Sequence, residues 1–244
     1  MLFKTIHAER MKLKHSPVWL AFFILPVIPA VMGTFNYLQC LDILKSGWYS
    51  LWTQHTLFEC YFFLPAIIGV YCSYLCRLEH LNHNWNTVMT VPVPVSCIYF
   101  AKLLSASFMV ILTQIWIGIL FFISGKLCGI TGPVPSKLAA WLIYGMIGGI
   151  VICALQICIS LVIRSFAVPV GIALMGGIAG MAAMVKGYGA YFPYSLISVG
   201  MCANNPRGVM QCTMSQFVLS SIIYVAVFCI FTVLYLKKRD VIAG

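Results

Sequence analysis

The hydrophobic positions of this chain fall into six long apolar runs separated by short polar stretches. A helix needs about 20 residues to cross the hydrocarbon core of a bilayer, and each run is close to that length. Strands of a membrane barrel would alternate apolar and polar positions, whereas residues 151–163 are apolar on every face. The pattern therefore predicts an all-α integral membrane protein with six transmembrane helices. The runs cover residues 17–37, 56–76, 98–124, 137–163, 166–185 and 215–236.

Composition supports the same class. Hydrophobic residues make up 62% of the chain and charged residues only 8%, whereas about a quarter of a soluble domain is charged. The loops are too short for a separate soluble domain, so residues 1–244 are expected to form a single membrane domain. Four prolines within the runs are expected to kink their helices. They are Pro26, Pro29, Pro65 and Pro169.

The basic residues are distributed unevenly between the two ends of the predicted bundle. Ten of the 15 Lys and Arg residues lie before the first run, in alternate loops, or after the last run. Excess positive charge marks the cytoplasmic side, so both termini are predicted to be cytoplasmic. This topogenic role, with attraction to lipid headgroups, explains most of the net charge of +10. Basic residues interleaved with aromatic ones are absent, so no nucleic-acid partner is expected.

Residues 1–16 form a basic amphipathic segment. A helix of this kind beside a span is expected to lie in the membrane interface. Its role is either that of a simple topogenic anchor or that of an elbow helix that contacts a cytoplasmic partner. The apolar face would contain Leu2, Phe3, Ile6 and Leu13. The charged residues assigned to the elbow are Glu9, Arg10, Lys12 and Lys14.

Residues 77–97, between the second and third runs, combine a glutamate, two histidines and a tryptophan in a polar setting. A short amphipathic helix is expected over residues 78–90. Pro92 and Pro94 would end it, because proline lacks an amide donor and disfavours helix before it. The segment is either a part that transmits force between a partner and the spans, or an interfacial loop anchored by Trp85.

The spacing of Glu79, Trp85 and Pro92, followed by an apolar run that a lysine opens, resembles the pattern of ABC transporter type-2 permeases. The start of the chain, in which Glu9 precedes Lys12-Leu13-Lys14, is similar to the start of members of that family. Within the family the chain most resembles the permease subunits of lantibiotic immunity exporters. These have six spans, a similar length, and a comparable Tyr-Phe-Pro-Tyr-Ser stretch, here residues 191–195.

This resemblance implies a transport subunit that is not itself an enzyme and holds no cofactor. The chain has no Gly-x-x-x-x-Gly-Lys-[Ser/Thr] loop, so ATP and Mg²⁺ would be bound by a separate cytoplasmic ATPase. The resemblance implies that this ATPase is a dimer. A second permease copy or a related permease would complete the transporter in a bacterial plasma membrane. The substrate would be a lantibiotic-type peptide. Residues expected to couple to the ATPase are Glu79, His80, His83, Trp85, Met89 and Pro92.

Three other functions stay open. The chain could be an exporter permease for another amphiphile or drug, or a membrane sensor or scaffold that transports nothing. A membrane enzyme is the third, although the sequence has no convincing set of catalytic residues.

Candidate contacts with the substrate lie toward the outer side. Glu59, near the outer start of the second run, is an ionisable residue in a membrane segment, a feature that is costly and usually functional. It could instead lie shallow enough to be solvated by headgroups or water. His55 lies nearby, and Tyr191 and Tyr194 belong to residues 186–214, expected to form short re-entrant or interfacial helices.

Two further patterns concern packing and cysteine chemistry. Gly176 and Gly180 are four residues apart, so they allow a close helix contact, either within the chain or with a second permease. Most of the 11 cysteines lie in or beside the apolar runs and show no zinc-binding spacing, so no metal site is expected. Cys202 and Cys212 could form a disulfide if the exterior is oxidising.

Overall fold

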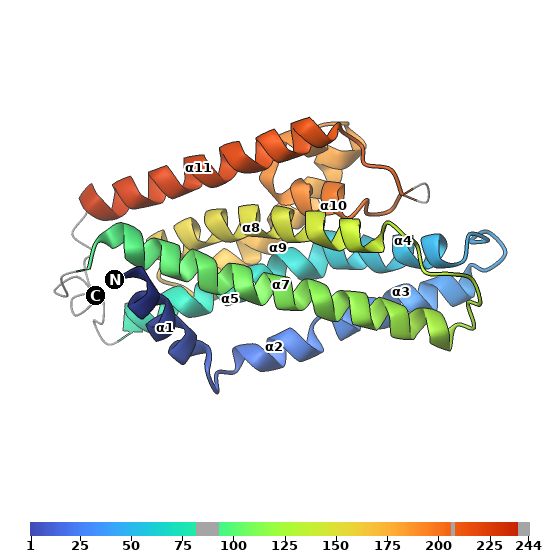
Figure 1. The fold of residues 1–244 in the computed structure, drawn as a ribbon, viewed down its shortest axis with the longest axis horizontal. Helices are drawn as coiled ribbons and strands as arrows, with labels where there is room; N and C mark the ends of the chain where they lie inside the picture. Colours follow the sequence, from blue (N-terminus) through green and yellow to red (C-terminus); the bar gives the residue numbers. More distant parts are fainter. Residues whose placement is uncertain (82–92, 206–207, 239–244) are drawn as a thin grey trace.

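The computed structural model describes residues 1–81, 93–205 and 208–238. These residues form helices and turns without any strand, and six of the helical segments are long and apolar enough to cross a membrane. They lie side by side along the long axis of the molecule (Figure 1). The predicted all-α fold with six membrane-spanning helices is therefore confirmed. The spans are Val18–Gln39, Trp48–His80, Val95–Leu127, Leu138–Val162, Ala167–Val185 and Met214–Lys238.

The first span consists of two helices, α2 (Val18–Ile24) and α3 (Val27–Gln39). The break between them lies at Pro26, as expected for a residue without an amide donor. Pro29 and Pro169 lie in the first turns of α3 and α9, where the amide has no partner within the helix. Helix α9 continues without a break past Pro169, so the kink predicted there is wrong, whereas the first span does break one turn before Pro29.

The second span begins at Trp48, earlier than predicted. Its start was missed because Ser50, Thr53 and His55 are polar, yet all three are buried within the bundle. The span contains α4 (Trp48–Phe58), a π-helical turn η1 (Glu59–Phe63) and α5 (Leu64–His80). The wide turn η1 precedes Pro65, which cannot donate to a carbonyl of the preceding turn.

The remaining elements follow the sequence prediction closely. Helix α1 (Leu2–Leu13) precedes the first span, and α7 (Val95–Leu127), α8 (Leu138–Val162), α9 (Ala167–Val185) and α11 (Met214–Lys238) form the last four spans. Between α9 and α11 lie three short elements rather than a seventh span. They are η3 (Gly189–Tyr191), η4 (Pro193–Ser195) and α10 (Leu196–Gly200).

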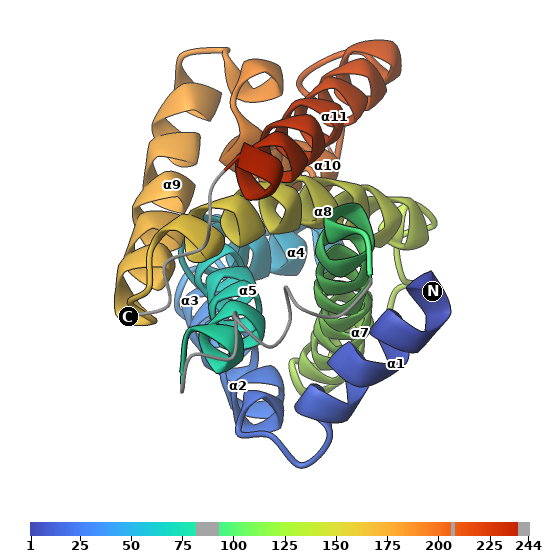
Figure 2. The same ribbon diagram turned by 90° about the vertical axis from the view of Figure 1, so that its left-hand side faces the viewer.

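Helices α5 and α8 form the centre of the bundle, with α7, α9 and α11 around them and α1 at the edge beside α7 (Figure 2). Their inward side chains are fully buried, including Ile67 and Ile68 of α5 and Ile152 of α8. Helix α11, by contrast, exposes a row of large apolar side chains. Because such a surface is costly in water, the bilayer is its natural solvent. The row includes Leu219, Ile222, Val227, Ile230 and Phe231.

Glycines permit close contacts between α8, α9 and the short elements that follow α9. A Cβ atom at Gly148 would lie 2.6 Å from the backbone nitrogen of Ile197 in α10. On α9, a Cβ at Gly176 would lie 2.6 Å from the ring of Tyr194, and one at Gly180 would lie 3.2 Å from the nitrogen of Ser195. The structure thus uses this glycine pair for a contact within the chain.

The tight contact at Gly148 leads to a prediction. Gly148→Ala should lower the thermal unfolding temperature in detergent, because the new methyl group meets backbone atoms and overpacking costs about 1–3 kcal/mol. Gly171→Ala is the matched control, since nothing lies within 4 Å of the added Cβ. That variant should be neutral or more stable, because alanine favours a helix by up to about 1 kcal/mol over glycine. Equal unfolding temperatures for the two variants would contradict the packing at Gly148.

Candidate functional site

Four charged side chains meet at the end of the bundle where α1 lies. Lys102 Nζ is 2.7 Å from Glu79 Oε1 and 3.1 Å from Glu9 Oε1. Lys12 Nζ is 2.7 Å from the same oxygen of each glutamate. These four residues, called the ion cluster below, contain two negative and two positive charges, so the group is neutral as a whole.

The ion cluster joins three elements that are distant in the sequence. Glu9 and Lys12 lie one turn apart on α1, Glu79 lies in the last turn of α5, and Lys102 lies near the start of α7. Lys102 is fully buried, and its ammonium group also donates to the carbonyl oxygen of Leu75, 3.0 Å away. All three ammonium protons of Lys102 thus have an acceptor.

Because the ion cluster is buried, its charge pairs matter for the stability of the fold. Glu9 and Glu79 are each 2% exposed, and removing a charge from water is expensive unless a partner of opposite charge replaces the hydration. Each carboxylate offers its Oε1 to both lysines, while its buried Oε2 has no hydrogen-bond partner among the described residues. Loss of one lysine would leave a buried negative charge, so the four residues hold α1, α5 and α7 together only as a set.

The structure shows how α1 meets the bundle. Leu13 and the charged Glu9 are its buried residues, whereas Phe3, from the apolar face predicted to lie in the membrane interface, is 87% exposed. Arg10 and Lys14 are exposed, and Lys12 alone of the basic residues on this helix reaches the ion cluster. The position of α1 is therefore set by charge pairing as well as by apolar packing.

Of the residues predicted to couple to an ATPase, Glu79 and His80 are described. The carboxylate of Glu79 is buried inside the ion cluster. His80 Nε2 lies 3.0 Å from the carbonyl oxygen of Ser160 and so connects α5 to α8. The other four residues of this group lie outside the described residues, and their coupling role stays a prediction. They are His83, Trp85, Met89 and Pro92.

Glu59 is deeper than the sequence indicated. It opens the π-helical turn η1, eleven residues after Trp48, and is only 3% exposed. Its Oε1 is buried and has no hydrogen-bond partner among the described residues. His55, one turn earlier, is also buried, and its Nε2 lies 3.0 Å from Thr34 Oγ1. Since that hydroxyl donates to Ala30, the histidine is the donor in this bond.

Tyr191 and Tyr194 lie in different environments. Tyr191 is 63% exposed, and its carbonyl oxygen accepts a hydrogen bond from Tyr224 of α11 at 2.6 Å. Tyr194 is buried, and its hydroxyl oxygen accepts a bond from Gln156 Nε2 at 2.7 Å. Burial raises the pKa of Tyr194 to about 12, so the phenol stays neutral. Among the four predicted substrate contacts, only Tyr191 is open to a ligand in this conformation.

All 11 cysteines are free thiols, so the disulfide between Cys202 and Cys212 that the sequence left open is not formed. Among the described residues, no group of three or more His, Cys, Asp or Glu side chains could hold a metal ion. The ion cluster, with its paired buried charges, is the candidate functional site of the described residues.

The family model described as ABC-2 family transporter protein matches residues 5–180, well over half of the chain. The chain belongs to this family. It is thus a multi-pass membrane protein and a permease component of an ABC transporter, which is generally not catalytic itself. The matched part of the permease contains all four residues of the ion cluster, whereas the stretch 191–195 lies beyond it. No curated protein and no solved structure is significantly similar to this chain.

The ion cluster of the permease leads to a second prediction. Lys102→Met should destabilise the fold by about 3–5 kcal/mol, because it leaves two buried carboxylates with one ammonium group. Adding Glu79→Gln should recover part of this loss, because the cluster then keeps one negative and one positive charge. The measurement is thermal unfolding of all variants in the same detergent.

Lys126→Met is the control, because Lys126 is an exposed residue at the far end of the same helix. It should unfold like the wild type. Additive losses in the double variant would show that Lys102 and Glu79 do not interact energetically.

Proposed function

We propose that this chain is the permease subunit of an ATP-driven exporter that removes lantibiotic-type antimicrobial peptides from the membrane of the producing or resistant bacterium. Family membership supports the role as a permease that works with a separate ATPase. The observation that carries the coupling part of the proposal is the ion cluster, which connects α1, α5 and α7.

The chain connectivity explains why this cluster matters for coupling. Helix α5 ends at His80, just before residues 82–92, and α7 begins at Val95, just after them. An ATPase that binds residues 82–92 would therefore act on the ends of two spans. Glu79 and Lys102 pair those two ends at 2.7 Å with hardly any exposed surface, so the two helices would respond as one unit. In this proposal Glu79 is a positioning residue rather than a contact of the ATPase.

The ion cluster would also bring α1 into the movement, because Glu9 and Lys12 supply half of its charges. Helix α5 packs against α8 and α9, so a movement of α5 caused by the ATPase would also act on these two helices. His80 supports this connection, because its bond to Ser160 fastens the same end of α5 to α8. The cytoplasmic location of this end follows from the excess of basic residues.

The peptide substrate is the finer part of the proposal. It rests on the resemblance of the chain to lantibiotic immunity permeases, including the stretch 191–195. The exposed ring of Tyr191, next to the lipid-facing helix α11, offers an amphiphilic peptide an aromatic contact. An exporter for another amphiphile or a drug would share the coupling mechanism and differ in this specificity.

The proposal predicts two measurable activities. Cells that express the permease with its partner ATPase should tolerate a higher lantibiotic concentration than cells with the ATPase alone. An ATPase variant that lacks the P-loop lysine should abolish the difference. Protection against unrelated amphiphilic drugs but not against lantibiotics would refute the peptide specificity while keeping the exporter function.

A separate measurement tests coupling. In nanodiscs, the purified permease should raise the ATP hydrolysis rate of its partner, and Trp85→Ala should reduce this stimulation at least several-fold while the protein stays folded. Phe35→Ala is the control, because Phe35 is an exposed aromatic residue within the first span. Full stimulation by the Trp85 variant would show that residues 82–92 do not transmit the signal.

A further inference from the structure

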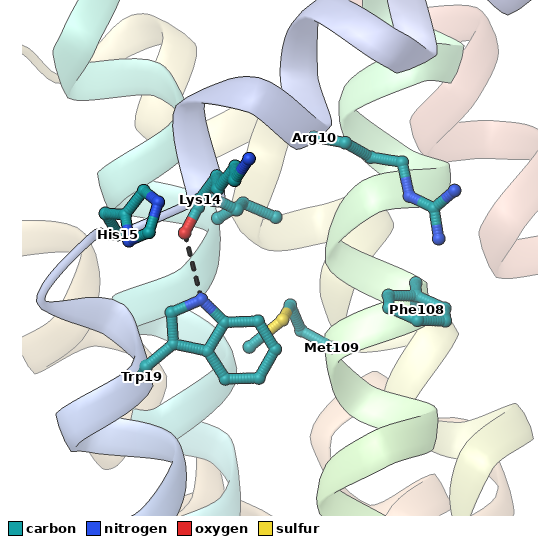
Figure 3. A pocket seen from close by; sticks show the side chains of 7 residues that line it. Arg10, Lys14, His15, Trp19, Phe108 and Met109 are labelled. Atoms are coloured by element: carbon teal, nitrogen blue, oxygen red, sulfur yellow. Dashed lines mark hydrogen bonds between the residues drawn. The ribbon is translucent and has the colours of Figure 1, made fainter.

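A cavity of about 450 Å³ lies where the end of α1 meets α2 and α7, and its lining residues differ from the four residues of the ion cluster. It is formed by the end of α1, the turn into α2 and the middle of α7. Figure 3 shows Arg10 above Phe108 on one side, and Lys14 and His15 above Trp19 on the other. The cavity, called the basic cavity below, is not used in the proposed coupling mechanism.

The lining of the basic cavity combines positive charge with an apolar wall. Arg10, Lys14 and His15 supply the polar part, and no acidic side chain of the described residues lines it. The guanidinium carbon of Arg10 lies 5.0 Å from the centre of the Phe108 ring, so the charge is held against the wall. Glu9, the neighbour of Arg10 in sequence, is buried in the ion cluster and already paired with two lysines. Such a site favours an anion that carries an apolar group.

Two local features keep the positive potential of this cavity from being cancelled. The carbonyl groups at the end of a helix carry partial negative charge. One of them, the carbonyl oxygen of Leu13, accepts a hydrogen bond from Trp19 Nε1 at 2.9 Å. His15 then turns the chain into α2 through a left-handed backbone conformation, with φ of 60°. The turn keeps His15 and Lys14 together at the cavity.

The position of Phe108 along α7 places the cavity at the depth of lipid headgroups. Helix α7 ends at Leu127, at the far end of the bundle from α1. Counting back the ~20 residues that cross the hydrocarbon core leads to the neighbourhood of Phe108. On the other side of the cavity, the first span begins at Val18, next to Trp19. Both walls therefore leave the hydrocarbon core at the level of Arg10 and Lys14.

We propose that the basic cavity binds the headgroup of an anionic phospholipid from the leaflet on the α1 side. Arg10, Lys14 and His15 contact the phosphate, and the first part of an acyl chain lies along Phe108 and Met109. The ion cluster holds α1 through Glu9 and Lys12, and the lipid holds it through Arg10 and Lys14. The lipid composition of this leaflet then affects how firmly α1 is attached.

Lipid retention by the full-length protein tests this proposal. The protein is purified in detergent and exchanged into mixed micelles with phosphatidylglycerol or phosphatidylcholine, and bound lipid is counted by native mass spectrometry. The wild type should retain phosphatidylglycerol in preference to phosphatidylcholine. The double variant Arg10→Gln/Lys14→Gln should bind phosphatidylglycerol at least about tenfold more weakly, since each basic residue near a membrane surface contributes on the order of a fivefold effect.

The matched control is Lys4→Gln/Lys126→Gln, which also removes two exposed positive charges but does not change the cavity lining. It should bind phosphatidylglycerol like the wild type. Equal weakening by both double variants, or no preference of the wild type for the anionic lipid, would overturn the proposal. Displacement of phosphatidylglycerol by millimolar inorganic phosphate would overturn the lipid as ligand and assign the site to a free anion.

Discussion

The burial of Lys102 is the constraint on which this end of the bundle depends. An ammonium group without any exposed surface is stable only if its three protons meet acceptors, and Glu9, Glu79 and the carbonyl oxygen of Leu75 provide them. These acceptors come from two different helices, so the amphipathic α1 and the end of α5 must both be in place before α7 can bury its lysine. Lys12 then balances the second carboxylate. Packing of apolar side chains alone would fix these elements less specifically.

This arrangement joins the helix ends on which a partner would act. The segment between α5 and α7 begins and ends next to the ion cluster, so a force on this segment would act on α1, α5 and α7 together. Opposite charges in a site with little water attract strongly, which favours movement of the helices as a unit over their separation. Helix α1 also supplies Arg10 and Lys14 to the basic cavity, so the same helix takes part in the ion cluster and in the proposed lipid site.

The middle of the bundle follows another rule. The π-helical turn at Glu59–Phe63 widens the second span where Pro65 cannot form the usual bond, and it carries a glutamate whose Oε1 has no partner among the described residues. Close to this level, glycines on α8 and α9 receive the short elements between α9 and α11. Irregular backbone of this kind is tolerated at membrane depth only where surrounding protein covers it.

The sequence by itself determined the fold class and the six spans, because helix length and apolarity are local properties that the bilayer thickness selects. It also identified Glu79 and the charged residues of α1 as unusual, but it assigned Glu79 to a partner surface and counted Lys102 only as a topogenic charge. Only the tertiary structure paired Glu79 with Lys102, since the two lie in different spans and neither pattern indicates the other. The early start of the second span was missed for the same reason. Polar side chains there face the interior, and a pattern of apolar residues cannot show which polar groups find partners inside the protein.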